Sequence, residues 1–308
     1  MRKAFVEALC DLAAIDKRIL LLTGDLGYMA LEPFRDRFPD RFINVGVAEQ
    51  NLIGIATGLG EAGFIPYAYS IATFISLRPL EFIRNGPVLH RLPVRLVGMG
   101  MGFEYGHAGP THHAVEDICV LRTMPGLSIV VPADSPQAGS AIRKTADLPG
   151  PIYYSLGKDD RCLVPGLNGC FDMGRIQVVR GGEDIAIVTM GSIAMEVVAA
   201  ADELAAVGIE ATVAVLSSFS PDPIDDLTAV LSRFECVISV EAQTVSGGLG
   251  AFVATLIASQ GLSCRLTLMA VCSSPDGTSG NQHERWRKHH LDHTAIVRNA
   301  MDAIGAKR

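Results

Sequence analysis

The chain has 308 residues, with 26 Lys and Arg against 33 Asp and Glu, and therefore a formal net charge of −7. Apolar residues make up 49% and charged residues only 19%, less than the ~25% that is usual for soluble domains. This length suggests about two domains, and the low charged fraction suggests that partners cover part of the surface. The acidic balance argues against a nucleic-acid-binding protein, which normally carries a basic patch.

Targeting signals are not evident in the sequence. Charges interrupt the N-terminal segment, which argues against a signal peptide. Residues 62–77 form a long uncharged stretch, but it contains Pro66 and is shorter than a membrane span. The seven cysteines are odd in number and include no C-x-x-C pair, so we expect reduced, mostly buried thiols in a cytoplasmic protein.

Strand-like and helix-like patterns alternate along the first half of the chain. Short apolar runs predict strands at 19–22, 42–45, 64–68, 94–97, 128–131 and 152–154. Helices are expected around residues 5–13 and near 48–60, 73–85, 114–122 and 135–146. Because the strands are apolar without alternation, we expect a parallel sheet covered on both faces by helices.

A second pattern follows an irregular stretch. Residues 157–175 gather Gly, Pro, Asp and Asn, so we place a linker there. Beyond it, strands are predicted at 185–189, 211–216, 236–240 and 264–268, with helices near 192–206, 225–233, 247–259 and 293–304. The sequence thus predicts an α/β protein of two doubly wound domains, residues 1–165 and 176–308.

Glycines and histidines follow the predicted strand at 94–97. The run Gly98–Gly102 lacks the G-x-G-x-x-G spacing of a dinucleotide site, so we interpret it as a loop that approaches a ligand. Since open α/β sheets bind ligands at their carboxyl ends, His107, His112 and His113 are interpreted as substrate-contacting or acid/base groups. Zinc-type cysteine spacing is missing, which argues against a metal. The histidines within 283–293 lie among basic residues, and we expect a solvated, polar helix start there.

Glu49 lies between a predicted strand and an apolar helix, with Val45, Val47 and Ile53 close in sequence. A glutamate in a first helical turn usually just complements the helix dipole. In such apolar surroundings, however, a desolvated carboxyl could hold a proton to share with a ligand nitrogen. Phe74 is interpreted as a core aromatic or as a flat wall for a stacked ring.

Taken together, these segments resemble the C-terminal half of transketolases, including the members split over two genes. The matching segments are Arg2–Phe5, Gly24–Leu26, Asn44–Gln50, Ala72–Phe74, Ile83–Asn85, Gly109–Asp117, Pro125-Gly126, Val131–Asp134, Val240-Glu241 and Gly247–Gly250. The resemblance implies a pyrimidine-binding domain followed by the family's C-terminal domain. It further implies a thiamine-diphosphate-dependent enzyme that transfers a two-carbon ketol or acyl unit from a keto donor to an aldehyde.

The resemblance also implies roles for single residues. Glu49 would hydrogen-bond the aminopyrimidine ring and favour its imino tautomer, while Phe74 would stack on that ring. Asp25 would lie beside the cofactor, and His112 would contact the donor's oxygen atoms, so that Glu49 and His112 are the catalytic candidates. The further substrate-binding candidates are His107, His113, Arg78 and Lys158.

The family's G-D-G…Asn motif, which binds diphosphate and magnesium, does not occur in the sequence. Gly24-Asp25-Leu26 lacks the second glycine, and the resemblance places those ligands in an N-terminal domain. We therefore expect one subunit of a split enzyme. A diphosphate-binding partner chain would hold most of the Mg²⁺ ligands, and two copies of each chain would form an α2β2 assembly.

Three substrate contacts of ordinary transketolases are replaced. Ala108 stands where the family has an aspartate, Gly100 where many members have a histidine, and Leu156 where an arginine binds phosphate. A site without those groups should select hydroxyl and phosphate poorly, which predicts non-standard substrates. Two alternatives stay open: a member that uses 2-oxo acids, similar to dehydrogenase β subunits or deoxyxylulose-phosphate synthase, and a non-catalytic assembly partner.

Overall fold

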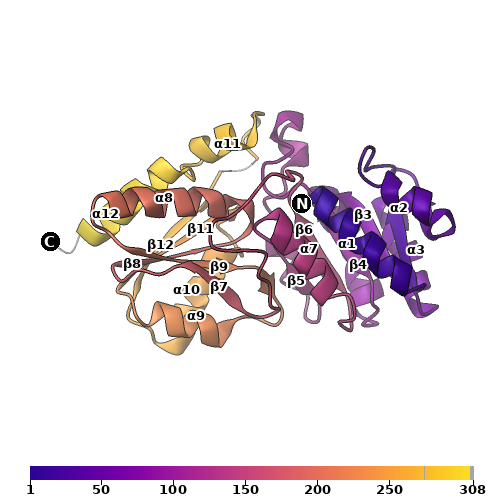
Figure 1. The fold of residues 1–308 in the computed structure, drawn as a ribbon, viewed down its shortest axis with the longest axis horizontal. Helices are drawn as coiled ribbons and strands as arrows, with labels where there is room; N and C mark the ends of the chain where they lie inside the picture. The colour runs from indigo at the N-terminus through magenta and orange to yellow at the C-terminus, as the bar shows by residue number, and fades with distance from the viewer. Residues whose placement is uncertain (274, 306–308) are drawn as a thin grey trace.

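The structure, a computed structural model, describes residues 1–273 and 275–305. Its first sheet has seven strands (Figure 1). Their spatial order is β10 (Ser218–Phe219), β5 (Ser128–Val130), β6 (Ile152–Leu156), β4 (Arg95–Met99), β3 (Ile65–Ile71), β1 (Ile19–Thr23) and β2 (Phe42–Asn44). All neighbours pair in parallel except β10 and β5.

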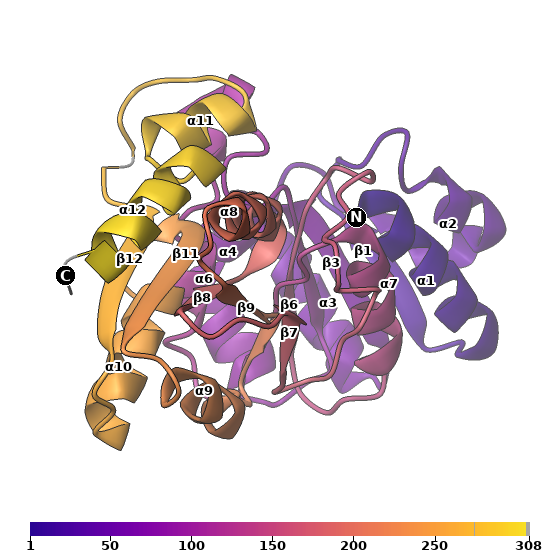
Figure 2. The same cartoon turned by 60° about the vertical axis from the view of Figure 1, so that its left-hand side comes forward.

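Helices cover both faces of this sheet, as the uninterrupted apolar strands predict. Strands β1, β3, β4 and β6 are buried along their whole length, which requires cover on both sides. The two layers consist of α1 (Arg2–Ile15), α2 (Glu32–Arg37) and α7 (Ser135–Lys144) on one face, and α3 (Glu49–Glu61), α4 (Ala72–Leu77) and α6 (Asp117–Leu121) on the other (Figure 2). Asp134 caps α7 by accepting a hydrogen bond from the Gln137 N–H at 2.8 Å.

The second sheet has five strands, in the order β12 (Arg265–Val271), β11 (Cys236–Thr244), β8 (Ile185–Thr189), β9 (Ala211–Leu216) and β7 (Ile176–Arg180). Strand β7 pairs antiparallel with β9. Helices lie on both sides of this second sheet in Figure 1. Above it lie α8 (Ala194–Ala206), α11 (Gln282–Lys288) and α12 (His293–Gly305), and below it lie α9 (Ile224–Leu231) and α10 (Leu249–Gln260). The predicted α/β class with two sheets is therefore confirmed.

Several predicted elements differ in detail. The single helix expected at 73–85 is divided at Pro79 into α4 and α5 (Leu80–Ile83), because proline removes a backbone donor inside a helix. The helix expected at 114–122 is confined to α6. Strand β10 lies within the second expected domain but pairs with β5 of the first sheet, so the two halves share one sheet.

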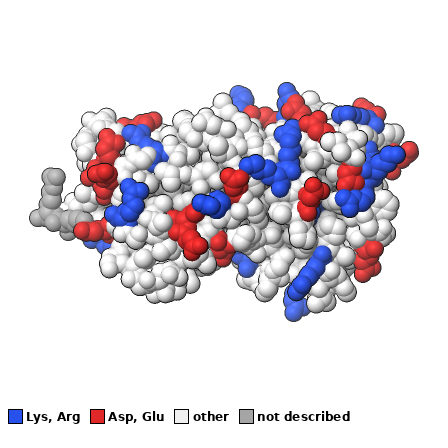
Figure 3. All heavy atoms as spheres, turned by 60° about the horizontal axis from the view of Figure 1, so that its bottom comes forward, with Lys and Arg blue, Asp and Glu red and all other residues white. Residues whose placement is uncertain are grey.

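The distribution of surface charge and the burial of the cysteines agree with what the composition predicts. Charged side chains of both signs lie scattered over the face in Figure 3, with wide uncharged areas between them. All seven cysteines are free, and Cys10, Cys119, Cys162 and Cys236 are buried, as expected. Across residues 1–273 and 275–305, no helix combines the length and apolarity that crossing a membrane would take.

Candidate active site

The candidate residues gather at the carboxyl edge of the first sheet, where open α/β sheets bind ligands. Gly24 and Asp25 follow β1, Glu49 begins α3, and α4 follows β3 directly. Strand β4 leads into the glycine-rich loop 100–113, which contains two short 3-10 turns, Gly106–Ala108 and Pro110–His112. Four segments far apart in sequence thus meet at one edge.

Glu49 is buried at the N-terminus of α3, and both of its carboxylate oxygens have partners. The Ser70 hydroxyl donates to Oε1 at 3.0 Å, and Arg78 Nη1 lies 2.8 Å from Oε2. Ser70 is itself fully buried at the end of β3. The carboxylate is therefore held in one orientation, with Oε1 fixed from the sheet and Oε2 facing the arginine.

Phe74 joins this carboxylate to the histidine loop. The guanidinium carbon of Arg78 lies 3.7 Å from the Phe74 ring centroid, which is cation–π contact. The His112 ring approaches Phe74 edge-on, with the two centroids 4.9 Å apart and an interplanar angle of 63°. The predicted residues Glu49, Phe74, Arg78 and His112 therefore form one contiguous group.

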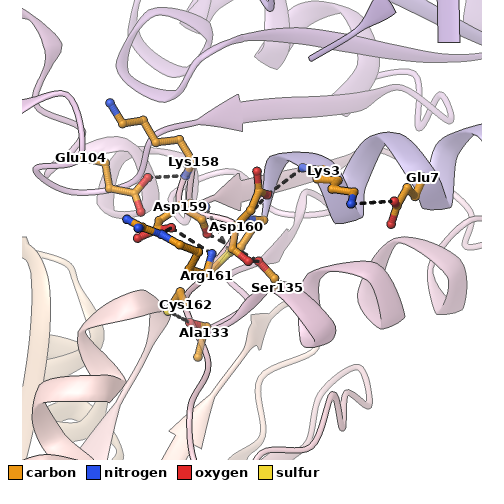
Figure 4. Close-up of polar contacts among 12 residues, drawn as sticks. Lys3, Glu7, Glu104, Ala133, Ser135, Lys158, Asp159, Asp160, Arg161 and Cys162 are labelled. Atoms are coloured by element: carbon orange, nitrogen blue, oxygen red, sulfur yellow. Dashed lines mark hydrogen bonds and ion pairs between the residues drawn. The ribbon is translucent and has the colours of Figure 1, made fainter. Parts of the chain in front are cut away.

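Tyr105 extends this group toward Lys158. Its ring centroid lies 6.5 Å from that of His112, and the Lys158 ammonium lies 4.5 Å from the same tyrosine ring. The backbone N–H of Lys158 donates to buried Glu104, whose pKa is raised by burial to about 7, while the ammonium extends away from this contact (Figure 4). Lys158 is thus anchored through its backbone and presents its charge beside Tyr105.

Asp25 lies next to the group but has partners of its own. Asn44 Nδ2 donates to its Oδ1 at 2.8 Å and the Tyr28 hydroxyl at 2.9 Å, and these two hydrogen bonds lower the pKa of Asp25. A Cβ on neighbouring Gly24 would lie 3.8 Å from Glu49 Oε1. Asp25 therefore borders the carboxylate without contacting it.

The other two histidines of the loop do not join the group. His107 is exposed at the loop tip. His113 is buried and meets Phe103 edge-on, with centroids 5.0 Å apart, while Phe103 stacks on His289 of the second half. Burial and the nearby Arg285 charge lower the pKa of His113. His113 therefore faces away from Glu49.

The expectation of a solvated, polar helix start within 283–293 is confirmed for His283, Glu284, Arg287 and Lys288, which are exposed, but not for Arg285. A capping box of Asn281 and Glu284 does begin α11, but Arg285 is buried, with its Nη2 2.6 Å from Asp276 Oδ2. The Lys288 ammonium lies 2.8 Å from the same oxygen. Asp276, which lies in the preceding loop, compensates the positive charges of Arg285 and Lys288, so Arg285 can be buried without contact to solvent.

This cluster of Asp276, Arg285, Lys288 and His289 supports the histidine loop. The loop that carries Asp276 also carries Gly280, and the Gly280 N–H donates to the Gly106 carbonyl of the histidine loop at 3.1 Å. A Cβ at Gly106 would lie 2.3 Å from the Gly280 carbonyl oxygen, so the close approach requires glycine. The C-terminal domain thus fixes the loop that carries His112.

Comparison with known proteins decides the family. The family model for the transketolase pyrimidine binding domain matches residues 1–160, and the model for the transketolase C-terminal domain matches residues 174–295. The chain belongs to the transketolase family.

Relatives of similar length support this assignment. An apulose-4-phosphate transketolase subunit of Phocaeicola vulgatus is 31% identical, over 98% of this chain and 97% of that one. The 6-deoxy-6-sulfo-D-fructose transketolase subunit of a Clostridium species is 32% identical, over 88% of this chain and 84% of that one. A solved structure described as a split gene transketolase, inactive β4 tetramer, matches with a TM-score of 0.89 and 31% identity, covering 100% and 99% of the two chains.

Some residues of the transketolase motifs have structural tasks in this chain. Asp117 is buried and accepts hydrogen bonds from the Tyr153 hydroxyl at 2.6 Å and the Ser155 hydroxyl at 3.0 Å, which tie α6 to β6. Glu241 accepts the backbone N–H groups of Leu249 and Gly250, each at 2.7 Å. These motif positions hold the fold together.

Of the three positions where the sequence is expected to depart from ordinary transketolases, one has a packing explanation. A Cβ at Gly100 would lie 2.2 Å from the Tyr105 ring, so Tyr105 fills the space into which a histidine at position 100 would extend. Leu156 is buried at the end of β6, and Ala108 lies exposed in the loop.

Sequence reasoning missed Ser70 and Tyr105. A hydroxyl at the end of an apolar strand is a signal that could have pointed to Ser70, since buried polar groups need partners. Tyr105 lies in the loop already chosen for its histidines, and its aromatic ring gave a second signal there.

Proposed function

We propose that this chain is the C-terminal subunit of a two-chain, thiamine-diphosphate-dependent transketolase that acts on non-standard substrates. The observation that carries the proposal is the buried Glu49 carboxylate, held by Ser70 beside the Phe74 ring at the carboxyl edge of the first sheet. It occurs in a chain of transketolase-family sequence and fold. Seven free cysteines support a cytoplasmic location.

Glu49 and Phe74 suit the pyrimidine half of the cofactor. The Arg78 guanidinium, a flat group with N–H donors, already lies against the ring and the carboxylate together, so the pair accommodates a planar nitrogen base. When bound, thiamine diphosphate supplies the carbon nucleophile and the electron sink of the transfer. Glu49 would hold a proton at the ring nitrogen, Phe74 would orient the ring, and His112 would contact donor oxygens.

The diphosphate and Mg²⁺ belong to the proposed partner chain. Among residues 1–273 and 275–305, no three His, Cys, Asp or Glu side chains are grouped so that they could hold a metal. A partner with the G-D-G…Asn motif would supply these ligands, and α2β2 is the stoichiometry that we propose. Tyr28, Met29 and Val47 expose large apolar surface beside Asp25 and Glu49, where such a partner would close the site.

The substrates are proposed to differ from xylulose 5-phosphate and ribose 5-phosphate. The side chains of Gly100, Ala108 and Leu156 offer no group that could bind a hydroxyl or a phosphate. Lys158, Arg78, His112 and the exposed His107 are the groups left to recognise the donor and the acceptor. Activity with pyruvate as donor would instead favour the member that uses 2-oxo acids.

The experiment that tests the proposal is reconstitution. The chain is mixed with a candidate partner protein from the same genome that carries the diphosphate motif, together with thiamine diphosphate, Mg²⁺ and a panel of ketose, 2-oxo acid and aldehyde substrates. We expect turnover only when both chains are present. Robust turnover by this chain alone would rule out the split-site proposal. Preferred use of xylulose 5-phosphate and ribose 5-phosphate would rule out the proposal of non-standard substrates.

Glu49→Ala separates catalysis from assembly. In the reconstituted enzyme it should lower kcat by at least ~100-fold, since proton transfer contributes about 10²–10⁴-fold. Glu61→Ala, at the exposed other end of the same helix, is the matched control and should retain activity. Full activity of Glu49→Ala would instead indicate a non-catalytic assembly partner.

A further inference from the structure

Arg78 contacts the same two groups that the proposed function reserves for the cofactor's pyrimidine ring. Its Nη1 lies 2.8 Å from Glu49 Oε2, and its guanidinium carbon lies 3.7 Å from the Phe74 ring centroid. A guanidinium is planar and carries N–H donors, as an aminopyrimidine does. One side chain therefore makes both the carboxylate contact and the stacking contact.

The two groups cannot bind at the same time. Glu49 Oε1 already accepts the Ser70 hydroxyl, so Oε2 is the oxygen that faces a ligand, and Arg78 holds it. A ring that reached Oε2 while stacking on Phe74 would need the space of the guanidinium, because stacked groups lie in van der Waals contact. His112 also packs against Phe74, with the two ring centroids 4.9 Å apart, so the space around this ring is already shared by two side chains.

Arg78 is also the member of the pair that is able to move. Its side chain is 45% exposed, whereas that of Glu49 is 2% exposed, so the arginine is the outer partner. Its backbone follows α4 and is fixed by the Phe74 carbonyl, which accepts the Arg78 N–H at 3.2 Å, and by Pro79 as the next residue. The long side chain can rotate into solvent while the helix stays in place.

We propose that Arg78 is a gate for the cofactor's pyrimidine ring, and this inference rests on the proposed function. In the closed position Arg78 neutralises Glu49 and covers Phe74. The ring enters when Arg78 leaves, and the ring nitrogen takes over Oε2. Arg78 thus competes with the cofactor and sets its affinity, which is a role separate from the substrate contact expected from sequence.

Removal of the competitor should strengthen binding of the pyrimidine. A contact that combines cation–π attraction with a charged hydrogen bond is worth enough to change affinity by about tenfold when it is lost from the closed state. Arg78→Met keeps most of the stem but removes the charge and the plane. Arg78→Lys keeps the charge without the plane, and should lie between the wild type and Arg78→Met.

The experiment uses the pyrimidine half of the cofactor alone, 4-amino-5-hydroxymethyl-2-methylpyrimidine, titrated calorimetrically into the full chain. Arg78→Met should bind it about tenfold more tightly than the wild type, and Arg84→Met, an exposed arginine whose Nη1 donates to neighbouring Asn85, should bind it like the wild type. Equal or weaker binding by Arg78→Met overturns the gate, as does absence of binding in both proteins at millimolar concentration. A crystal structure with the probe should show Arg78 away from Glu49.

A double variant separates failure of the gate from failure of the proposed function. If Glu49→Ala abolishes probe binding in the Arg78→Met background, the site is the one proposed and the gate is tested at the correct place. If the wild type binds the probe through Glu49 but Arg78→Met brings no gain, only the gate is overturned. If tight binding in Arg78→Met survives Glu49→Ala, the ring lies elsewhere, and both the gate and the assigned cofactor site are wrong.

Discussion

Two arginines of this chain each contact one carboxylate and one phenylalanine ring, but one arginine is half exposed and the other is buried. Arg78 lies over Phe74 and pairs with Glu49, and Arg285 lies over Phe103 and pairs with Asp276. At the first site the carboxylate is the buried partner and the arginine is half exposed. At the second the arginine is 2% exposed and is held as well by Thr278 and His289.

The difference indicates which pair is fixed and which can open. A buried guanidinium that loses its carboxylate becomes an uncompensated charge in a low dielectric. A half-exposed guanidinium that leaves its carboxylate is hydrated at once, so opening that pair costs far less than opening a buried one. The Arg285 pair therefore supports the histidine loop permanently, whereas the Arg78 pair can exchange partners.

The largest expected effect comes from the buried arginine. Arg285→Met should lower the free energy of unfolding by about 3 kcal/mol, because it removes a buried partner of Asp276, leaves that carboxylate to Lys288 and Thr278, and loosens α11. Urea unfolding at neutral pH measures the loss. Arg287→Met, on the exposed side of the same helix, should change stability by less than ~0.5 kcal/mol. A loss below ~1 kcal/mol for Arg285→Met would contradict the fixed role of this pair.

The next effect depends on pH. Burial raises the pKa of Asp276, but hydrogen bonds from Lys288, Arg285 and Thr278 outweigh it and hold that pKa well below its usual range. The folded pKa lies below the unfolded value of about 3.9, so the ionised carboxylate stabilises fully above that value, and its contribution fades as the pH falls further. Asp276→Asn should cost about 2 kcal/mol at pH 7.

Urea unfolding of the wild type and Asp276→Asn across pH 3 to 8 checks this sign. The difference between the two proteins should stay constant down to about pH 5 and shrink below about pH 4, where the unfolded aspartate takes up its proton. A difference that grows toward low pH would show that Asp276 is not the ionised partner of Arg285.

The smallest expected effect belongs to the exposed arginine. Arg78→Met should lower the free energy of unfolding by about 1.4 kcal/mol, the equivalent of the tenfold competition, and no more, because the pair lies at the surface and Ser70 still donates to Glu49. The same urea titration measures it beside Arg285→Met. If the two losses were equal, the contrast between an exchangeable and a fixed pair would fail, and so would the physical basis of the gate.

Local patterns predicted the elements that position the site. The strand expected at 19–22 is β1, and Glu49 begins the helix expected at 48–60, because apolar runs and helical periodicity are local properties of the sequence. The carboxyl-edge rule then indicated the loop that carries His112, whereas apolar neighbours and the family resemblance indicated Glu49, and the resemblance indicated Phe74. The structure brings these three residues together with Arg78, although it places His113 elsewhere.

Long-range pairing could not be predicted from such patterns. Nothing near Arg285 in sequence shows that Asp276 folds back onto it, so a basic, histidine-rich helix suggested a solvated face. Strand β10 has two residues, too short to show any periodicity. Ser70 lies beyond the end of its predicted strand, and its role is to donate a hydrogen bond to Glu49, which is 21 positions away.

The short strand β10 also bears on how the polypeptide can be divided. Ser218 and Phe219 pair with the edge of β5, and the Ser128 hydroxyl donates to the Ser220 carbonyl at 2.7 Å. A fragment that stopped near residue 165 would present β5 as an open edge with unpaired N–H and C=O groups, a template for aggregation. The two halves are therefore a single unit for expression, for domain exchange between relatives and for any engineered fusion.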